Sequence, residues 1–297
     1  MVRFPKKRQC PEPAPRRLAP NREMLHRLEM PRFRLAAMDL DDTLLCPQKR
    51  ISPENCAAVS RLQDLGIRVL LASGRRHESM VRFHQELGLD TILVSCQGAL
   101  VRANDSGHVV HRQSLDPASA AELVAEAARE NATLAYYHSD GVYVARKNAF
   151  TDIYQSRGGE PLIECGDLQS LAGESPFKII WIDHPAQTRQ RFESGLSRYR
   201  GKFELVITCP EYVEFNACGV HKAAGLAAAA AHYGVPPEEV LAFGDGDNDV
   251  SMLEWAGFSV AMTVSTPAAR KAAKAVAPAG PCPSSLARAV DLALAPA

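Results

Sequence analysis

Short runs of apolar residues alternate with segments of helical spacing over two stretches of this chain. The runs are four to eight residues long, as read from the sequence, and lie at 33–40, 67–72, 91–96, 240–243 and 258–262. Continuous apolar runs of this length are typical of strands that are buried on both faces of a parallel sheet. We therefore predict a parallel sheet built from both stretches.

Helical patterns occupy the segments between these runs. Ser52 is a suitable N-cap for a helix over 53–65, and the segment 78–87 has apolar residues at helical spacing before Gly88. An Ala-rich helix is expected at 221–233 and a last helix at 284–294. Strands that alternate with helices predict an α/β fold, a Rossmann-like, doubly wound parallel sheet.

The middle of the chain, residues 98–217, has a different pattern. Two short β-like runs, 135–137 and 142–145, flank a turn at Ser139-Asp140-Gly141, which indicates an antiparallel hairpin. Helical segments are expected at 117–130 and 185–199. We predict that this part is an α+β cap domain inserted into the core, which would comprise residues 33–97 and 218–297.

The first 32 residues contain many Pro and Arg residues and no apolar period, so we predict a flexible basic extension. Met24 and Met30 stand shortly before the first apolar run, so part of this extension could come from a misassigned start codon. A basic arm that recruits a partner is an alternative, and deletion of residues 1–29 would test it.

Composition narrows the classes of partner. Lys plus Arg and Asp plus Glu number 34 each, which gives a formal net charge of 0 and predicts no binding to nucleic acid or to an anionic membrane surface. The eight cysteines form no Cys-x-x-Cys pair and no run of roughly 20 apolar residues or signal peptide is present, so we expect a cytoplasmic protein with reduced thiols. A monomer or a small homo-oligomer is equally compatible with the sequence.

Two acidic loops follow predicted strands. Asp39, Asp41, Asp42 and Thr43 come at the end of the first apolar run, and the sequence Gly-Asp-Gly-Asp-Asn-Asp at 244–249 ends another. Because ligands of open α/β sheets lie beyond the carboxyl ends of the strands, both loops should meet at one edge. Clustered carboxylates there favour a hard divalent cation such as Mg²⁺. A calcium loop is disfavoured, since the terminal Glu of an EF-hand is missing.

Two further features suggest a bound phosphate. Ser73 and Gly74 stand at a third strand end, where a hydroxyl group and free backbone N–H groups could hold phosphate oxygens. Lys222 stands at the start of a predicted helix, where its positive charge opposes the helix dipole. This position is compatible with a nearby anion or with a solvated surface lysine.

Together and in this order, the motifs Asp-x-Asp-x-Thr, Ser-Gly-Arg, Lys and Gly-Asp-x-x-Asn-Asp resemble the four motifs of the haloacid dehalogenase superfamily. An α+β insert between the second and third motifs is similar to that of the Cof-type phosphatases. The resemblance covers nearly everything after Met30. It implies a Mg²⁺-dependent phosphatase, a phosphoric monoester hydrolase, that acts on a small phosphorylated metabolite such as a sugar phosphate or a phosphorylated cofactor.

The resemblance also implies roles for individual residues. Asp39 would attack phosphorus and form an aspartyl phosphate, and Asp41 would act as general acid and base. Substrate phosphate would be bound by Ser73, Gly74, Lys222 and Asn248. The metal would be held by the carboxylates of Asp39 and Asp245, the backbone carbonyl of Asp41, and Asp249 either directly or through water.

Several points stay open at this stage. Gln97 and Ala223 depart from the usual residues of the family, which puts the cap hinge and the fit of the substrate in doubt. The aromatic residues of the insert, Tyr136, Tyr137, Tyr143 and Trp181, are expected in the core of the cap more than in a pocket. A phosphotransferase or phosphomutase with the same nucleophile, or a catalytically silent metabolite-binding protein, are the alternatives to a phosphatase.

Overall fold

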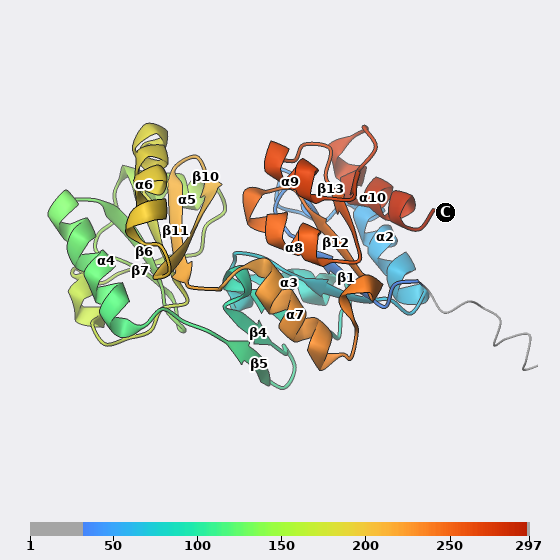
Figure 1. Cartoon of the computed structure of the whole chain (residues 1–297), viewed down its shortest axis with the longest axis horizontal. Helices are drawn as coiled ribbons and strands as arrows, with labels where there is room; N and C mark the ends of the chain where they lie inside the picture. Colours follow the sequence, from blue (N-terminus) through green and yellow to red (C-terminus); the bar gives the residue numbers. More distant parts are fainter. Residues whose placement is uncertain (1–31, 296–297) are drawn as a thin grey trace, which may run out of the picture. The chain divides into compact units, whose positions relative to one another are not determined.

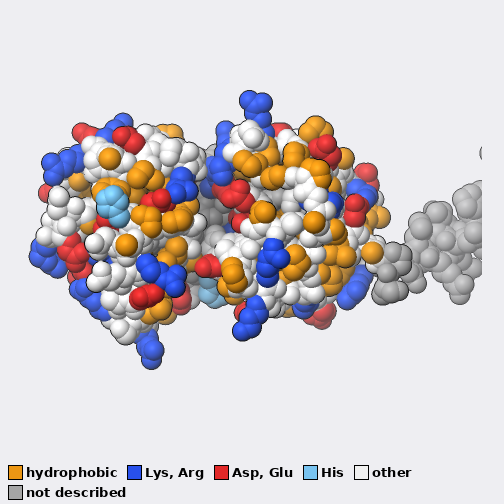
Figure 2. All heavy atoms as spheres, turned by 90° about the horizontal axis from the view of Figure 1, so that it is seen from above, with side chains coloured by type: hydrophobic (Ala, Val, Ile, Leu, Met, Phe, Trp, Pro, Cys, Tyr) orange, Lys and Arg blue, Asp and Glu red, His pale blue; other side chains and the backbone are white. Residues whose placement is uncertain are grey.

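A computed structural model describes residues 32–295 of the chain. The predicted extension, apart from Arg32, lies outside the described residues. None of the helices in the described part is both long and apolar enough to cross a membrane. On the face drawn in Figure 2, acidic and basic side chains are interspersed, in agreement with the formal net charge of 0.

A five-stranded parallel sheet forms the core, as predicted. Its order is β14-β13-β12-β1-β2. The strands are β1 Leu35–Met38, β2 Arg68–Leu71, β12 Val240–Gly244, β13 Phe258–Ala261 and β14 Ala275–Val276. Strands β1 and β12 come from opposite sides of the insert and pair directly in the middle of the sheet. The two acidic loops that follow them therefore leave the same edge.

Helices cover both faces of this sheet, which confirms the Rossmann-like, doubly wound architecture (Figure 1). Along β1, Ala36 and Met38 pack in one hydrophobic cluster, and Leu35 and Ala37 pack in another, because successive side chains point to opposite faces. The first cluster includes residues of α2 Pro53–Asp64, α3 His77–Glu86 and α10 Ser285–Ala293. The second includes residues of α7 Lys222–His232, α8 Val250–Trp255 and α9 Pro267–Ala272.

The predicted helix boundaries agree closely with the structure. Ser52 caps α2, as expected, since its hydroxyl oxygen accepts a hydrogen bond from the backbone N–H of Asn55 at 3.1 Å. Helix α7 begins at Lys222, with His221 as its N-cap. Short 3₁₀ turns are η1 Cys96–Gly98, η2 Leu168–Leu171, η3 Pro237–Glu239, η4 Asp247–Asp249 and η5 Cys282–Ser284.

The apolar run at 91–96 does not extend the parallel sheet as predicted. Its strand, β3 Leu93–Ser95, belongs to a three-stranded antiparallel sheet with β4 Leu100–Arg102 and β5 Val109–Arg112. An isolated bridge between Ala72 and Val94 joins it to the end of β2. The turn at η1 reverses the chain, so β3 pairs with β4, its neighbour in sequence.

The cap sheet has six strands in the order β10-β11-β9-β6-β7-β8. They are β6 Thr133–Tyr137, β7 Val142–Val144, β8 Leu162–Glu164, β9 Lys178–Ile182, β10 Phe203–Cys209 and β11 Tyr212–Ala217. The predicted hairpin is confirmed as the antiparallel pair β6–β7. Residues of α4 Pro117–Glu130 and α6 Pro185–Arg198 pack on one face, and Tyr154 of α5 Ala149–Ser156 packs on the other.

The exact limits of the cap remain a prediction. The six-stranded sheet lies inside the proposed range of 98–217. Strands β4 and β5 contact helix α7, and Val101 shares a hydrophobic cluster with Leu226 of that helix. These contacts favour a cap that begins closer to α4 than to residue 98.

Candidate active site

Asp39 lies one residue beyond β1, at the carboxyl end of the parallel sheet. Its backbone N–H donates to the carbonyl oxygen of Phe243 at 3.0 Å, so the chain is still held by β12 at this point. The residue is only 6% exposed, and its carboxylate accepts a hydrogen bond from Lys222 Nζ. Sheet pairing therefore fixes the predicted nucleophile in a buried position.

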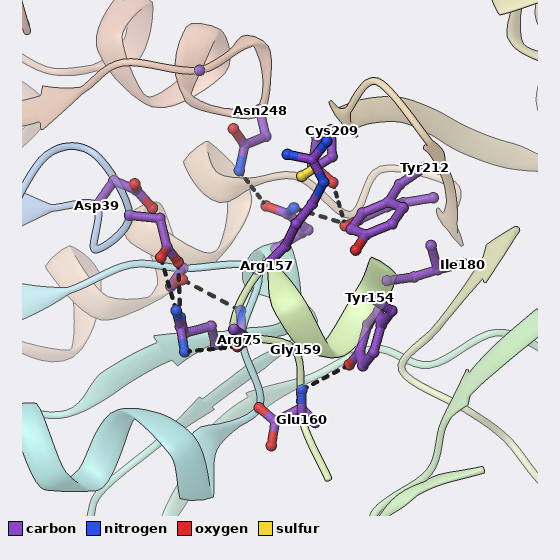
Figure 3. A pocket seen from close by; sticks show the side chains of 18 of the residues that line it. Asp39, Arg75, Tyr154, Arg157, Gly159, Glu160, Ile180, Cys209, Tyr212 and Asn248 are labelled. Atoms are coloured by element: carbon purple, nitrogen blue, oxygen red, sulfur yellow. Dashed lines mark hydrogen bonds and ion pairs between the residues drawn. The ribbon is translucent and has the colours of Figure 1, made fainter. Parts of the chain in front are cut away.

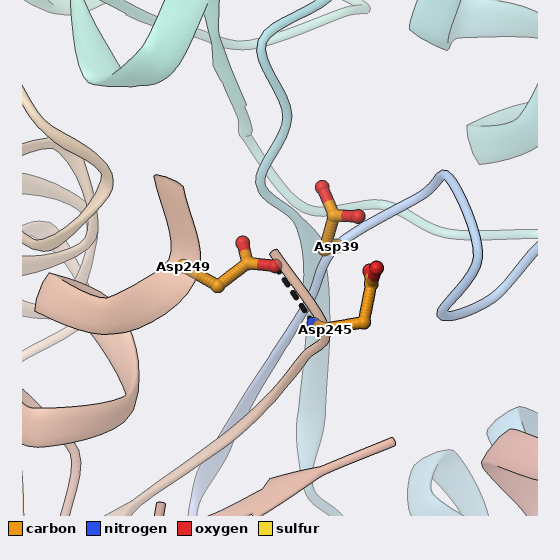
Figure 4. A group of neighbouring side chains, drawn as sticks. All are labelled: Asp39, Asp245 and Asp249. Atoms are coloured by element: carbon orange, nitrogen blue, oxygen red, sulfur yellow. Dashed lines mark hydrogen bonds between the residues drawn. The ribbon is translucent and has the colours of Figure 1, made fainter. Parts of the chain in front are cut away.

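The second acidic loop leaves the neighbouring strand β12. Asp249 Oδ2 accepts hydrogen bonds from the backbone N–H groups of Asp245 and Gly246 at 2.9 and 3.0 Å, which folds the loop back on itself. Thr43 Oγ1 donates to Asp245 Oδ1 at 2.9 Å and so links the two loops. Figure 4 shows the side chains of Asp39, Asp245 and Asp249 converging on one place.

These three carboxylates fit a divalent cation. One oxygen from each lies within 4.8 Å of the others. Burial raises the pKa of Asp39 well above its usual value even though Lys222 opposes this, and burial together with the charge of Asp249 raises the pKa of Asp245 to about 7. Burying like charges side by side is costly without a counterion, and Mg²⁺ prefers such oxygen ligands.

Lys222 is completely buried at the first position of α7. Its Nζ contacts Asp39 and donates to Asp249 Oδ1 at 2.5 Å. Burial lowers the pKa of Lys222, but the charges of Asp249 and Asp39 outweigh burial and raise it. The unfavourable position of this lysine at a helix N-terminus is thus explained by anionic partners, and the surface alternative is wrong.

Asp41 is held differently from the other acidic residues. Its carboxylate pairs with Arg75, through two N···O contacts of 2.8 Å, and with Lys49 at 2.6 Å. Burial raises the pKa of Asp41, but the hydrogen bonds and charges of Arg75 and Lys49 outweigh it and lower the pKa to about 2. Its side chain is outside the group of three carboxylates, which leaves its backbone carbonyl as the predicted ligand.

The predicted phosphate-binding residues lie close by. The backbone N–H of Arg75 donates to Ser73 Oγ at 3.3 Å. A Cβ atom at Gly74 would stand 2.5 Å from Gln97 Nε2, so the missing side chain at Gly74 leaves room for the amide group of Gln97. Asn248 Nδ2 donates to Gln97 Oε1 at 3.2 Å. Gln97, which departs from the family pattern, thus bridges two of the predicted phosphate-binding positions.

A cavity of about 420 Å³ opens over these residues (Figure 3). Asp39, Asp41, Ser73, Gly74, Asp245 and Asn248 line it. Lys222 and Asp249 do not line it, and Lys222 contacts both Asp39 and Asp249. The structure therefore brings all predicted site residues together, six of them at the cavity surface.

Several lining residues were not predicted from the sequence. They include Arg75 and Lys49, which hold Asp41, and the cap residues Lys178, Tyr212 and Glu214. Tyr137 lines the cavity and is also buried in a hydrophobic cluster of the cap, as expected, and Tyr136 and Trp181 are in the core of the cap as expected too. One feature of the sequence could have pointed to the cap residues of the cavity: Lys178 is a charged residue directly before the apolar strand residues Ile179-Ile180-Trp181.

Comparisons with known proteins identify the family of this chain. The family model of haloacid dehalogenase-like hydrolases matches residues 36–281. The chain belongs to this family. The comparisons also confirm the prediction that the chain belongs to the Cof-type subgroup of this family.

Two relatives with named activities are phosphatases. The 5-amino-6-(5-phospho-D-ribitylamino)uracil phosphatase YitU of Bacillus subtilis (strain 168) is 31% identical over 77% of this chain and 86% of its own length. The HMP-PP phosphatase of Enterobacter sp. (strain 638) is 28% identical over 77% of this chain and 84% of its own. These relatives confirm the predicted enzyme class, a phosphoric monoester hydrolase.

Solved structures support the fold. The sugar phosphatase BT4131, of subclass IIB of the superfamily, superimposes with a TM-score of 0.77 over 88% of this chain and 100% of its own. The two sequences are 18% identical, so this likeness concerns the fold alone. It is consistent with a Rossmann-like core that carries a cap.

Proposed function

We propose that this protein is a Mg²⁺-dependent phosphatase that hydrolyses a small phosphorylated metabolite through an aspartyl phosphate on Asp39. The observation that carries this proposal is the group of Asp39, Asp245 and Asp249, whose oxygens lie within 4.8 Å of one another at the base of the cavity. A sugar phosphate or a phosphorylated cofactor is the proposed substrate class. The names of the relatives support this class, since they act on phosphorylated small molecules.

The proposed metal site uses the three carboxylates and the backbone carbonyl of Asp41. Asp249 already accepts hydrogen bonds at both oxygens, which favours contact with the metal through water. Bound Mg²⁺ would neutralise the acidic cluster and attract the phosphoryl oxygens. Lys222 would add a fixed positive charge next to the nucleophile, where negative charge develops during transfer.

In the first proposed step, a carboxylate oxygen of Asp39 forms a bond to phosphorus and the bond from phosphorus to the leaving oxygen breaks. Asp41 gives its proton to the departing alcohol. Water then attacks the aspartyl phosphate and Asp41 takes the proton from it, so that phosphate is released and the Asp39 carboxylate returns. Ser73, Gly74 and Asn248 would hold the phosphoryl oxygens during both steps.

Asp41 must carry a proton in the first step, yet in the structure its carboxylate pairs with Arg75 and Lys49. The first step therefore requires these ion pairs to loosen when a substrate binds. A phosphate group above Asp39 would compete for both cations, because all of these side chains line the same cavity. Arg75 and Lys49 would then exchange their ion pairs with Asp41 for ion pairs with the phosphate of the substrate.

Phosphate release from purified protein tests the proposal. We expect release from para-nitrophenyl phosphate and from some members of a panel of phosphorylated metabolites, dependent on Mg²⁺ and abolished in Asp39→Asn. EDTA-treated protein is the control for the metal. Release that persists in Asp39→Asn would contradict the nucleophile, and release only when a sugar acceptor is supplied would indicate a phosphotransferase.

A further inference from the structure

The cavity wall contributed by the cap comes from one face of its six-stranded sheet. Tyr137, Lys178, Ile180, Tyr212 and Glu214 stand at alternate positions of β6, β9 and β11, so their side chains share that face. Figure 3 shows Ile180 and Tyr212, with Tyr154 of α5, across the cavity from Asp39. A leaving group attached to a phosphate at Asp39 would meet this wall.

Lys178 and Glu214 form a buried ion pair on the wall. They are 2% and 3% exposed, and Lys178 Nζ lies 2.9 Å from Glu214 Oε2. Gln97 Nε2 donates to the same oxygen at 3.1 Å, and Thr208 Oγ1 donates to Oε1 at 2.7 Å. The charges of the pair cancel, but Lys178 has three donors and can still donate to an uncharged acceptor.

The other cations of the cavity are also neutralised. Lys49 and Arg75 pair with Asp41 and, in the proposed mechanism, move to the transferring phosphate, so neither is left for a second anion, and Arg157 pairs with Glu211 at 2.6 Å. Thus every lysine and arginine that lines this cavity in the described part of the chain already has a carboxylate partner. A second anionic group on a substrate would lose water here without gaining a free cation, which is costly.

Tyr212 offers an uncharged contact. Its hydroxyl group is buried and has no hydrogen-bond partner among the described residues. By contrast, the hydroxyl groups of Tyr137 and Tyr154 bond to each other at 2.6 Å. The rings of Tyr154 and Tyr212 lie 6.0 Å apart, so the wall combines aromatic surface with one free polar group. Buried polar groups usually have partners, so a ligand is the expected partner of Tyr212.

From these contacts we propose that the cavity selects phosphomonoesters whose leaving group is an uncharged ring bearing hydroxyl or amide groups, and that Lys178, Glu214 and Tyr212 determine this selection. The inference rests on the proposed phosphatase function. Lys178 donates to an oxygen of the ring, Tyr212 bonds to another polar atom, and the aromatic wall covers the ring. Esters with a second phosphate or a carboxylate are rejected.

Matched substrate pairs test this selection. Uridine 5′-monophosphate and orotidine 5′-monophosphate differ by one ring carboxylate, and fructose 6-phosphate and fructose 1,6-bisphosphate differ by one phosphate. We expect kcat/KM for phosphate release to be at least about tenfold higher for the uncharged-ring member of any pair that is turned over, with para-nitrophenyl phosphate as the common reference.

Two variants should move this preference in opposite directions. Glu214→Gln leaves Lys178 as an unpaired buried cation, so the ratio of kcat/KM for the neutral to the anionic member should fall about tenfold. Lys178→Met leaves Glu214 unpaired, so the same ratio should rise. Thr208→Val is the matched control, because it removes a hydrogen bond to Glu214 but no charge, and its ratio should stay that of the wild type.

Circular dichroism of each variant would verify folding, and either variant alone is sufficient for the test. Equal turnover of both members by the wild type, or a ratio that neither charge variant changes, would overturn this inference while the phosphatase function stands. Phosphate release from no ester, including para-nitrophenyl phosphate, would contradict the proposed function and this inference together.

Discussion

At the scale of single residues, Lys222 has the clearest energetic role. It is buried between Asp39 and Asp249, and its removal leaves both carboxylates without their cation. The loss of one partner from a buried ion pair costs about 3–5 kcal/mol, while an exposed pair contributes less than about 1 kcal/mol. Lys222 therefore supports both the stability of the site and its chemistry.

We predict that Lys222→Met lowers kcat/KM by about 100-fold or more, because a fixed positive charge next to the transferring phosphoryl group is lost. In the absence of metal, its free energy of unfolding should fall by about 3 kcal/mol. Phosphate-release kinetics and urea unfolding measure the two effects. Lys271→Met, at an exposed position of α9, should change neither. Wild-type kinetics in Lys222→Met would contradict the proposed role of Lys222 in phosphoryl transfer.

His77 makes stability depend on pH. It is 1% exposed, and its Nδ1 has no hydrogen-bond partner among the described residues. Burial lowers the pKa of His77 to about 4, with Arg102 acting in the same direction. Below its unfolded pKa of about 6.5, the unfolded chain binds a proton that the folded chain does not, so stability falls as the pH drops from 6.5 towards 4.

The corresponding prediction compares unfolding at pH 7.5 and pH 5. His77 should account for about 2 kcal/mol of the stability lost between these values, since its folded pKa is lower than its unfolded one. His77→Leu should therefore lose less stability than the wild type on acidification, as measured by urea unfolding. His108→Leu, at an exposed position, should keep the wild-type dependence. Identical pH dependence in all three proteins would contradict this role of His77.

At the scale of elements, the turn η1 packs against the N-terminus of helix α7. Cys96, Gln97 and Gly98 all have positive φ values, of 50°, 60° and 98°. A Cβ atom at Gly98 would stand 2.5 Å from the carbonyl oxygen of His221, the N-cap of α7. This close packing positions the first turn of α7, where Lys222 begins the helix.

We predict that Gly98→Ala lowers the free energy of unfolding by about 2–4 kcal/mol, because a strained backbone angle and a collision with α7 act together. Gly107→Ala is the matched control, since Gly107 also has a positive φ, of 68°, but no atom within 4 Å of the added Cβ. The control should lose only about 1 kcal/mol. Equal losses in urea unfolding would show that the contact with α7 is unimportant.

The sequence was sufficient to predict most elements of the core, because fully buried strands such as β1 and β12 appear as continuous apolar runs. It did not predict the partner of β3, since an apolar run does not tell which strand it pairs with. The buried pair of Lys178 and Glu214 was also missed. These residues stand on different strands, 36 positions apart, and become neighbours only when β9 and β11 pair.

At the scale of the whole molecule, the site is assembled from distant parts of the described chain. The acidic loops come from β1 and β12, on opposite sides of the cap segment, and the cavity is completed by β6, β9 and β11 of the cap. The order of the motifs in the sequence predicted that the two acidic loops lie together, since both follow strands of one parallel sheet. The sequence did not predict which cap residues line the cavity, because that depends on how the cap side chains face it.

Deletion of residues 1–31 tests whether residues outside the described range contribute to turnover. All proposed catalytic, phosphate-binding and metal-binding residues lie between Asp39 and Asp249. We therefore predict unchanged kcat/KM for the truncated protein in phosphate-release assays, with the full chain measured alongside. A loss of turnover at unchanged stability would instead support the alternative that the basic segment takes part in binding a partner or a substrate.

Mg²⁺ should stabilise the folded protein, because its proposed ligands meet only after β1 and β12 have paired. A cation that binds the folded state alone, at about 100 times its dissociation constant, adds about 2.7 kcal/mol to the free energy of unfolding. Thermal unfolding with Mg²⁺ or EDTA should show this difference, and Asp245→Asn should reduce it strongly. Asp64→Asn, at an exposed position of α2, should respond like the wild type. If Mg²⁺ stabilises Asp245→Asn as much as the wild type, the cation binds elsewhere and the acidic loops are not its site.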